Sequence, residues 1–215
     1  MHGTKQKNLT VIEKGKLRKS MNAVERRNYW WNRAKIFFRF YSILLLPLSK
    51  NMLEYKYNKL RFKSGWLAIG KRYVCLKRMQ ARLPEDKYCI IQANVFIGNV
   101  DKLEIGDNTT INDNSYLECK GGITIGHDCL IGHEVTILSN SHLYGDINLN
   151  INLQGECEKT VHIGNNVWIG AKATILPGVT IGNNVIVGAN AVVNKSFPDN
   201  AVVAGVPAKI VSIRS

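Results

Sequence analysis

The chain has 215 residues, enough for one large domain or for one domain with an appendage. Its net charge of +13 is unevenly spread: residues 1–88 hold 22 Lys and Arg against 5 Asp and Glu, whereas residues 89–215 hold 7 against 11. The five cysteines are odd in number and show no CxxC spacing, which argues against a disulfide framework and against a zinc site.

Residues 1–60 are predicted to form a basic, partly helical N-terminal extension. The basic stretches Lys14–Lys19 and Arg26–Lys35 flank the aromatic cluster Tyr29, Trp30 and Trp31, ahead of the apolar run Lys35–Leu48. That run is shorter than the roughly 20 apolar residues of a membrane-spanning helix and contains an arginine, so we expect an interfacial helix or a helix packed on a partner.

Two interpretations of this extension stay open. It binds a membrane surface or an anionic polymer, which would make a cytoplasmic protein peripheral at the inner face of the membrane. Alternatively, it is a solvated extension whose apolar helix packs against the rest of the protein. Nucleic acid is not expected as a partner, because the sequence contains no known recognition motif.

A period of six residues dominates the chain from about residue 105. An aliphatic residue leads each hexad, and the fifth place is small or β-branched. The leading residues are Ile105, Ile111, Leu117, Ile125, Ile131, Ile137, Ile163, Ile169, Ile175, Ile181, Val187 and Val193. The fifth places hold Thr109, Ser115, Cys129, Val135, Val167, Ala173, Val179, Val185 and Ala191.

This period fits neither a helix, which repeats every 3.6 residues, nor an alternating strand. It is typical of a short strand followed by a corner rich in Gly and Asn, in coils that bury their apolar side by stacking. The sequence therefore predicts a mainly β fold, a left-handed parallel β-helix over residues 61–213. Three hexads make one coil, so residues eighteen apart stack. Irregular first coils are expected in "LAIGKRYV" (67–74) and "NVFIGNVDKLEIGDN" (94–108).

The repeat stops in "SNSHLYGDINLNINLQGECEKT", where we predict a loop excursion over residues 139–160. His142 stands near its start, outside the packed coils. There a neutral imidazole can take the proton of an attacking hydroxyl, worth about 10²–10⁴ in rate; the alternative is a solvated loop histidine. His127 and His133 are six residues apart, so we expect them at different, exposed corners.

The stretch "VHIGNNVWIGAKATILPGVTIGNNVIVGANAVVNKSFPDNAVVAGVPAKIV" (Val161–Val211) resembles the C-terminal half of hexapeptide acyltransferases. It is most similar to the galactoside, maltose, nodulation-factor and surface-polysaccharide O-acetyltransferases. The resemblance covers residues 97 to 213 and leaves out residues 1–88. It implies a homotrimer of β-helical prisms that uses acetyl-CoA as acyl donor in clefts between subunits.

The resemblance also implies roles for individual residues. His142 matches the general base, and Asn112 matches an asparagine that binds the acceptor or the tetrahedral intermediate; the alternative for Asn112 is one more corner asparagine. Trp168 matches a tryptophan that packs on the pantetheine arm of CoA, and its alternative role is packing between subunits.

Further donor-binding residues follow from the same resemblance. Small residues let CoA approach the backbone, and cations face its phosphates. These residues are Gly170, Ala171, Ala189, Asn194, Lys195 and Lys209. The chain departs from the galactoside enzymes at Ser212, where they carry a second arginine.

The expected function is an acetyl-CoA-dependent O-acetyltransferase that acts on a carbohydrate hydroxyl, in a surface polysaccharide or its precursor. Two alternatives stay open: an N-acetyltransferase of an amino sugar or small amine, and a non-catalytic β-helical scaffold. No metal is expected, because the γ-class carbonic anhydrases, which share the fold, resemble one another in an HxxxxH pair that this chain lacks.

Overall fold

The computed structural model of the protein describes residues 48–84 and 89–215. Contacts divide the chain into two compact units, 1–45 and 46–215, and the described residues belong to the second. The basic stretches, the aromatic cluster and nearly all of the apolar run of the N-terminal extension lie outside the described residues. Within them, no helix is long and apolar enough to cross a membrane.

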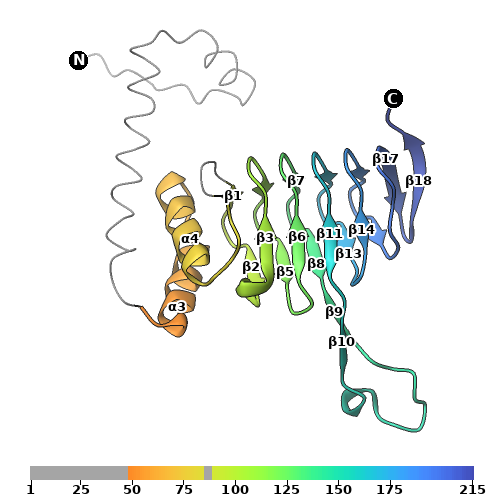
Figure 1. Ribbon diagram of the computed structural model, residues 1–215, viewed down its shortest axis with the longest axis horizontal. Helices are drawn as coiled ribbons and strands as arrows, with labels where there is room; N and C mark the ends of the chain where they lie inside the picture. Colours follow the sequence, from red (N-terminus) through yellow and green to blue (C-terminus); the bar gives the residue numbers. More distant parts are fainter. Residues whose placement is uncertain (1–47, 85–88) are drawn as a thin grey trace. The chain divides into compact units, whose positions relative to one another are not determined.

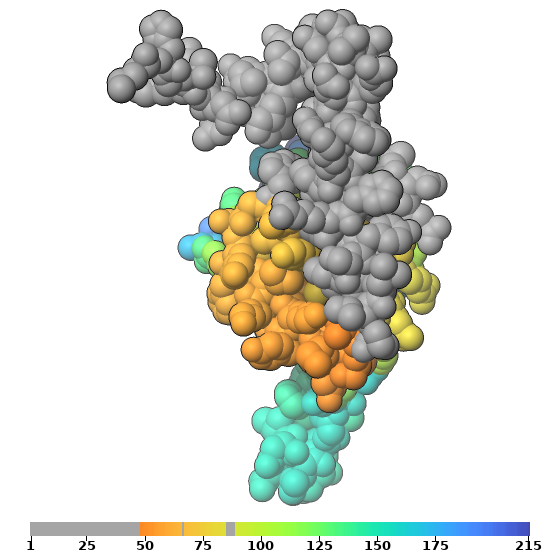
Figure 2. Space-filling view, turned by 90° about the vertical axis from the view of Figure 1, so that its left-hand side faces the viewer, coloured from red at the N-terminus to blue at the C-terminus, as the bar shows by residue number. Residues whose placement is uncertain are grey.

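Two helices, α3 (Lys50–Arg61) and α4 (Trp66–Arg78), precede the β-structure and pack on each other. The Ser49 side chain caps α3 by accepting a hydrogen bond from the amide of Met52. The buried Tyr57 hydroxyl donates to the carbonyl of Val95, at 2.9 Å. The helices thus cover the first coil and continue its apolar core, and Figure 2 shows them from their outer side.

The prediction of a coil in "LAIGKRYV" is wrong, because these residues lie in α4. Apart from Val74, the buried positions of α4 and its C-terminal end repeat with the period of a helix: Ala68, Arg72, Cys75, Leu76 and Met79. In the hexad "IGKRYV", Tyr73 would occupy the fifth place, which in a coil admits only small or β-branched side chains. In the helix, the Tyr73 ring is instead partly buried and packs against the hydrophobic core from outside.

Residues 90–213 form a parallel β-helix of triangular section, which confirms the predicted fold (Figure 1). Its three faces are called sheets A, B and C. Sheet A contains β3 (Leu103–Ile105), β6 (Ile123–Ile125), β11 (Val161–Ile163) and β14 (Thr180–Ile181). Sheet B contains β1 (Ile90–Ile91), β4 (Thr110–Ile111), β7 (Leu130–Ile131), β12 (Trp168–Ile169), β15 (Ile186–Val187), β17 (Ala201–Gly205) and β18 (Ala208–Ile213). Sheet C contains β2 (Phe96–Gly98), β5 (Tyr116–Glu118), β8 (Thr136–Leu138), β13 (Thr174–Ile175) and β16 (Val192–Val193).

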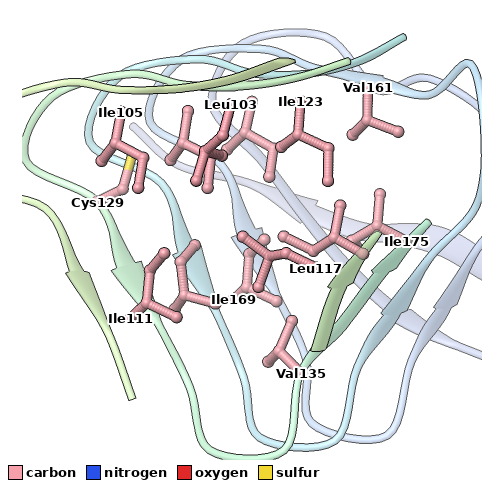
Figure 3. Close-up of a cluster of buried hydrophobic side chains, with 14 of the residues drawn as sticks. Leu103, Ile105, Ile111, Leu117, Ile123, Cys129, Val135, Val161, Ile169 and Ile175 are labelled. Carbon is pink, nitrogen blue, oxygen red and sulfur yellow. The ribbon is translucent and has the colours of Figure 1, made fainter. Parts of the chain in front are cut away.

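The interior is a column of the side chains that lead each hexad, joined by the small residues of the fifth places (Figure 3). Ile163 pairs with Ile181 and Ile169 with Val187, so the predicted stacking of residues eighteen apart is confirmed. Cys129 faces this core, where burial raises the pKa of its thiol. The small fifth places leave room for the larger aliphatic side chains at close packing.

The edges of the prism explain why Asn recurs in the sequence. Between sheets A and B, the residues at positive φ are Asn108, Asp128, Asn166, Asn184 and Asn200. Such a backbone turn strains most side chains, and Asn and Asp tolerate it best after Gly. The side-chain amides also link coils, as Asn166 does by donating to Asn184.

The C-terminal segment folds back as predicted for "AGVPAKIV". β18 runs antiparallel to β17, and the turn between them contains a cis peptide bond before Pro207. β17 itself continues the parallel ladder of sheet B. The C-terminal strand therefore extends the face that also contains Trp168.

Candidate active site

The chain leaves the prism at the edge between sheets C and A. Ile125 pairs with Ile163, thirty-eight positions later instead of eighteen, so twenty extra residues are inserted in this coil. The insertion projects as an arm built on β9 (Asn140–His142) and β10 (Glu156–Glu158), which pair antiparallel (Figure 1). A short 3-10 helix, η2 (Ile151–Leu153), lies near its tip.

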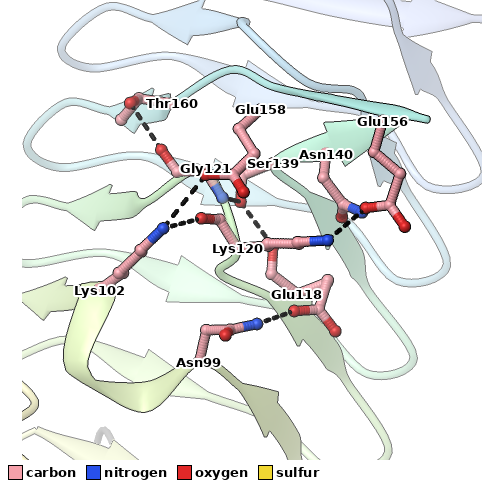
Figure 4. Close-up of polar contacts among 10 residues, drawn as sticks. All are labelled: Asn99, Lys102, Glu118, Lys120, Gly121, Ser139, Asn140, Glu156, Glu158 and Thr160. Carbon is pink, nitrogen blue, oxygen red and sulfur yellow. Dashed lines mark hydrogen bonds and ion pairs between the residues drawn. The ribbon is translucent and has the colours of Figure 1, made fainter. Parts of the chain in front are cut away.

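The base of the arm is fixed by the hydroxyl of Ser139, which is fully buried (Figure 4). It accepts a hydrogen bond from the amide of Gly121, at 2.8 Å, and donates to the carbonyl of Glu118, at 2.7 Å. The carbonyl of Ser139 accepts from the amide of Lys159 on the returning strand. A Cβ on Gly121 would stand 2.2 Å from that carbonyl oxygen, so only glycine allows this close contact.

Two lysines from the same edge of the prism hold the returning strand β10. Lys120 pairs with Glu156 at 2.6 Å, and Lys102, in the 3-10 turn η1 (Val100–Lys102), pairs with Glu158 at 3.1 Å. The side-chain amide of Asn140 also donates a hydrogen bond to Glu156, at 3.0 Å. The hydrogen bonds that Lys120 and Asn140 donate lower the pKa of the Glu156 carboxyl, and donating to Glu156 raises the pKa of the Lys120 ammonium.

Sequence reasoning missed this anchoring network. Its signal was the two-residue slip in the repeat at "CKGG", where Lys120 and Gly121 contact the arm and its base (Figure 4). The alternation of acids in "GECEK" is a second signal, since it places Glu156 and Glu158 on one side of a strand.

His142 ends β9 and lies opposite Glu156 in the pairing of the arm. Its side chain is exposed, and no hydrogen bond ties its ring to another of the described residues. The other two candidate histidines stand at different corners, as predicted. His127 contacts Asp128 at 2.6 Å, and His133 lies 3.7 Å from Asp113. Of these three imidazoles, the one on the arm stands outside the stacked coils, and the other two lie at corners of the prism.

Asn112 follows β4 at the edge between sheets B and C, and it is half-buried. Its side-chain amide donates to the carbonyl of Ile131 in the next coil, at 2.8 Å. The side chain thus links two coils, as other corner asparagines do. Its amide oxygen has no hydrogen-bond partner among the residues that the structure describes, which leaves one acceptor for a ligand.

Trp168 projects outward from sheet B with 53% of its surface exposed. Leu130 and Ile186 flank it on the neighbouring strands, so an apolar strip runs along this face. A contiguous exposed apolar strip marks a binding surface.

The small residues stack at the edge between sheets B and C. A Cβ on Gly170 would lie 2.5 Å from the amide nitrogen of Ala189, so coil stacking itself requires glycine there. Ala171 is half-exposed and Ala189 exposed. The backbone at this edge is therefore open to a ligand mainly along the two alanines.

The cations predicted to face the phosphates lie on two parts of the prism. Asn194 and Lys195 are exposed at the edge between sheets C and A, and the Lys195 ammonium lies 5.8 Å from the ring centre of Phe197. Lys209 is exposed on β18, which belongs to sheet B. One chain therefore does not bring these two lysines to the same edge.

The predicted residues thus form two groups. His142, Asn194 and Lys195 lie at the edge between sheets C and A. The second group lies on sheet B or at its edge with sheet C: Asn112, Trp168, Gly170, Ala171, Ala189 and Lys209. Among the described residues, no group of three or more His, Cys, Asp and Glu could hold a metal ion.

Two family patterns match the β-helix. Residues 160–195 match the family described as bacterial transferase hexapeptide (six repeats), and residues 102–139 match the hexapeptide repeat of succinyl-transferase. The two matches lie on either side of the arm.

Acetyltransferases and putative acetyltransferases are also similar to this chain in sequence. A galactoside O-acetyltransferase of Escherichia coli is 34% identical over 144 residues, which cover 66% of this chain and 68% of that protein. A putative lipopolysaccharide biosynthesis O-acetyl transferase of the same organism is 41% identical over 112 residues, covering 49% of this chain and 57% of the relative.

The fold is also similar to that of a galactoside acetyltransferase solved in complex with coenzyme A. The TM-score is 0.65 at 32% identity, and the match covers 76% of this chain and 78% of that one. The repeat, the fold and these relatives lead to one conclusion: the chain belongs to the hexapeptide-repeat acetyltransferase family.

Proposed function

We propose that the protein transfers the acetyl group of acetyl-CoA to a carbohydrate hydroxyl, with His142 as general base. The observation that carries this proposal is the exposed imidazole on an anchored arm, in a chain whose relatives include galactoside O-acetyltransferases and a structure with bound coenzyme A. The anchoring matters because a general base must lie within hydrogen-bond reach of the proton that it takes.

The imidazole of His142 takes the proton from the acceptor hydroxyl as the oxygen attacks the thioester carbonyl. Collapse of the tetrahedral intermediate expels the thiolate of CoA, which receives the proton back from the imidazolium. The unpaired amide oxygen of Asn112 would accept a hydrogen bond from the acceptor, which orients its hydroxyl.

The donor is assigned to the face and edge that contain Trp168, Ala171 and Ala189. The exposed indole offers a flat apolar surface for the pantetheine arm. The open backbone beside the two alanines offers hydrogen-bonding groups. Lys195 and Lys209 are assigned to the phosphates.

A homotrimer would reconcile the two groups of residues. Within one chain, sheet C separates the base from the edge assigned to the donor. In a three-fold ring, the arm of one subunit can meet the donor face of the next, so each cleft becomes a complete site. Mixing His142→Ala with Trp168→Ala tests this, at an acetyl-CoA concentration too low for Trp168→Ala to turn over: subunit exchange should restore part of the activity. No recovery, with exchange shown by mass spectrometry, would refute a shared site.

We further assign the acceptor to surface polysaccharide or its precursor, and the protein to the cytoplasmic face of the membrane. Helix α3 and the residue that follows it support this assignment, because they expose Met52, Tyr55 and Phe62 among lysines 56 and 59. Exposed apolar and aromatic residues mixed with lysines are typical of interfacial helices. Sedimentation with phosphatidylcholine vesicles that contain or lack phosphatidylglycerol tests the contact: binding should require the anionic lipid and fall with salt.

The activity is tested directly by release of CoA from acetyl-CoA with a panel of glycan acceptors. The product distinguishes the alternatives, since an ester is cleaved by hydroxylamine and an amide is not. Trp168→Ala should raise the KM for acetyl-CoA, whereas Leu130→Ala on the same face should raise it less. Binding of acetyl-CoA without transfer to any acceptor would favour the scaffold alternative.

A further inference from the structure

Arg61 is the last residue of α3, and no carboxylate among the described residues neutralises its charge. Its side chain is half-buried, and it forms no ion pair with any of the described residues. Its Nε is the one buried side-chain nitrogen or oxygen in the described part of the chain that lacks a hydrogen-bond partner. Burying part of a guanidinium without satisfying its hydrogen bonds costs folding free energy, unless other contacts or a bound ligand offset that cost.

Aromatic rings hold this guanidinium in position. Its central carbon lies 4.8 Å from the ring centre of Phe62 and 5.6 Å from that of Phe96. The Phe96 ring in turn stacks on Tyr116, with centres 4.7 Å apart and planes within 10°. The stacked rings fix the orientation of the guanidinium, so less conformational entropy is lost when an anion binds it.

A pocket of about 270 Å³ opens beside this stack, lined by Arg61, Asn94, Phe96, Asn114, Ser115 and Tyr116. The amides of Asn94 and Asn114 are joined by a hydrogen bond at 2.9 Å on its polar side. Tyr116 leaves 40% of its surface exposed on the other side. A cation, two amides and an exposed aromatic ring in one hollow suit a sugar ring that bears a negative charge.

The pocket and the proposed base share one face of the prism. Phe96 pairs with Tyr116 and Tyr116 with Thr136, so the stack leads across sheet C to β8 (Figure 1). β8 is the strand from which the arm with His142 departs. An extended acceptor lying on sheet C could therefore meet both.

From this arrangement we propose that the pocket binds an anionic group of an acidic carbohydrate acceptor, with Arg61 as its cation. The proposal rests on the carbohydrate acetyltransferase function and names its substrate class. The guanidinium suits a carboxylate or a phosphate, because its planar fork can donate two parallel hydrogen bonds to either group. The sugar ring packs on the exposed part of Tyr116.

Equilibrium binding to the full chain, without acetyl-CoA, tests the pocket separately from catalysis. The probes are an oligogalacturonate, a neutral galactose oligomer of equal length, and glucose 1-phosphate. We expect an acidic probe to bind at least about tenfold more tightly than the neutral one. Comparing the oligogalacturonate, which carries carboxylates, with glucose 1-phosphate shows which anion the pocket prefers.

Arg61→Gln should remove this preference, and Arg61→Lys should restore only part of it, because lysine lacks the fork. The matched control is Lys59→Gln, which removes one positive charge from the exposed side of the same helix and should leave the preference unchanged. An equal loss in both variants would mean that only net charge matters, and would overturn the proposal.

Nuclear magnetic resonance of the arginine Nε–H groups in the unsubstituted protein avoids dependence on the folding of a variant. Adding the preferred acidic probe should shift the Arg61 signal and leave that of Arg72 in place. Equal binding of all three probes, or no shift at Arg61, would refute the anion subsite. If acetyl transfer failed while this shift persisted, the error would lie in the function and not in the pocket.

Discussion

Ser139→Ala should loosen the arm at its base. The substitution removes one buried oxygen that accepts from Gly121 and donates to Glu118. The two contacts are not equivalent. The Glu118 carbonyl keeps a second donor, the amide of residue 139, at 3.1 Å, whereas the Gly121 amide has no other acceptor within the described part of the chain.

The expected cost follows from this asymmetry. An orphaned, partly buried amide costs about 1–3 kcal/mol, whereas the carbonyl loses one of two bonds and costs less. We therefore expect Ser139→Ala to lower the free energy of unfolding by about 1–3 kcal/mol. Because the same contacts orient the strand that ends in His142, kcat for acetyl transfer should fall as well.

The assay is urea unfolding at a fixed protomer concentration, since the stability of the proposed trimer would depend on concentration. Ser141→Ala is the matched control: its hydroxyl is exposed on the arm, and its removal should change the free energy by less than about 0.5 kcal/mol. Equal stabilities for the two variants would refute the anchoring role of the buried hydroxyl.

Arg72→Met should lower the free energy of unfolding by about 3 kcal/mol. The buried guanidinium donates hydrogen bonds to the carbonyls of residues 60, 63 and 91. It therefore joins α3, α4 and the first coil. The carboxyl of Glu156 should titrate below the ordinary value of about 4.3 in a carbon-13 nuclear magnetic resonance titration, and Lys120→Gln should raise its pKa. Gly170→Ala should lower the melting temperature, because the new methyl group meets the backbone of Ala189.

Each of these has a control or a contrary outcome. Lys71→Met removes a neighbouring cation that is only half-buried and should cost much less than Arg72→Met. Gly145→Ala places its methyl group in open space and should leave the melting temperature unchanged. The Glu156 carboxylate stabilises the arm above its unfolded pKa, and this contribution is lost as the pH falls through the lower folded value. A titration midpoint unaffected by Lys120→Gln would contradict the ion pair.

The repeat predicted most of the prism because each hexad repeats the same physical requirement. A large aliphatic such as Ile163 and a small residue such as Val167 must alternate wherever coils stack, so the sequence displays the pattern directly. "LAIGKRYV" shows where this reading fails. It begins like a hexad, but Tyr73 does not fit the small place, and packing on α3 decides in favour of a helix.

The site was less accessible to sequence reasoning. His142 was found because it stands where the period breaks. The contacts that hold it, among them Lys120 with Glu156, join residues thirty-six positions apart, and no local pattern relates them. Gly170 was assigned to the ligand, whereas stacking under Ala189 already requires it. Arg61 lies outside the repeat altogether, and its pocket exists only once α3 packs on the first coils.

The measurement that tests the central claim most directly is kcat for acetyl transfer in His142→Ala. The comparison is His133→Ala, which removes an exposed corner imidazole from the same prism. We expect His142→Ala to lower kcat by about 10²–10⁴ with the structure and acetyl-CoA binding intact, and His133→Ala to leave it near the wild-type value. Wild-type kcat in His142→Ala would contradict the assignment of the base, and with it the role of the arm.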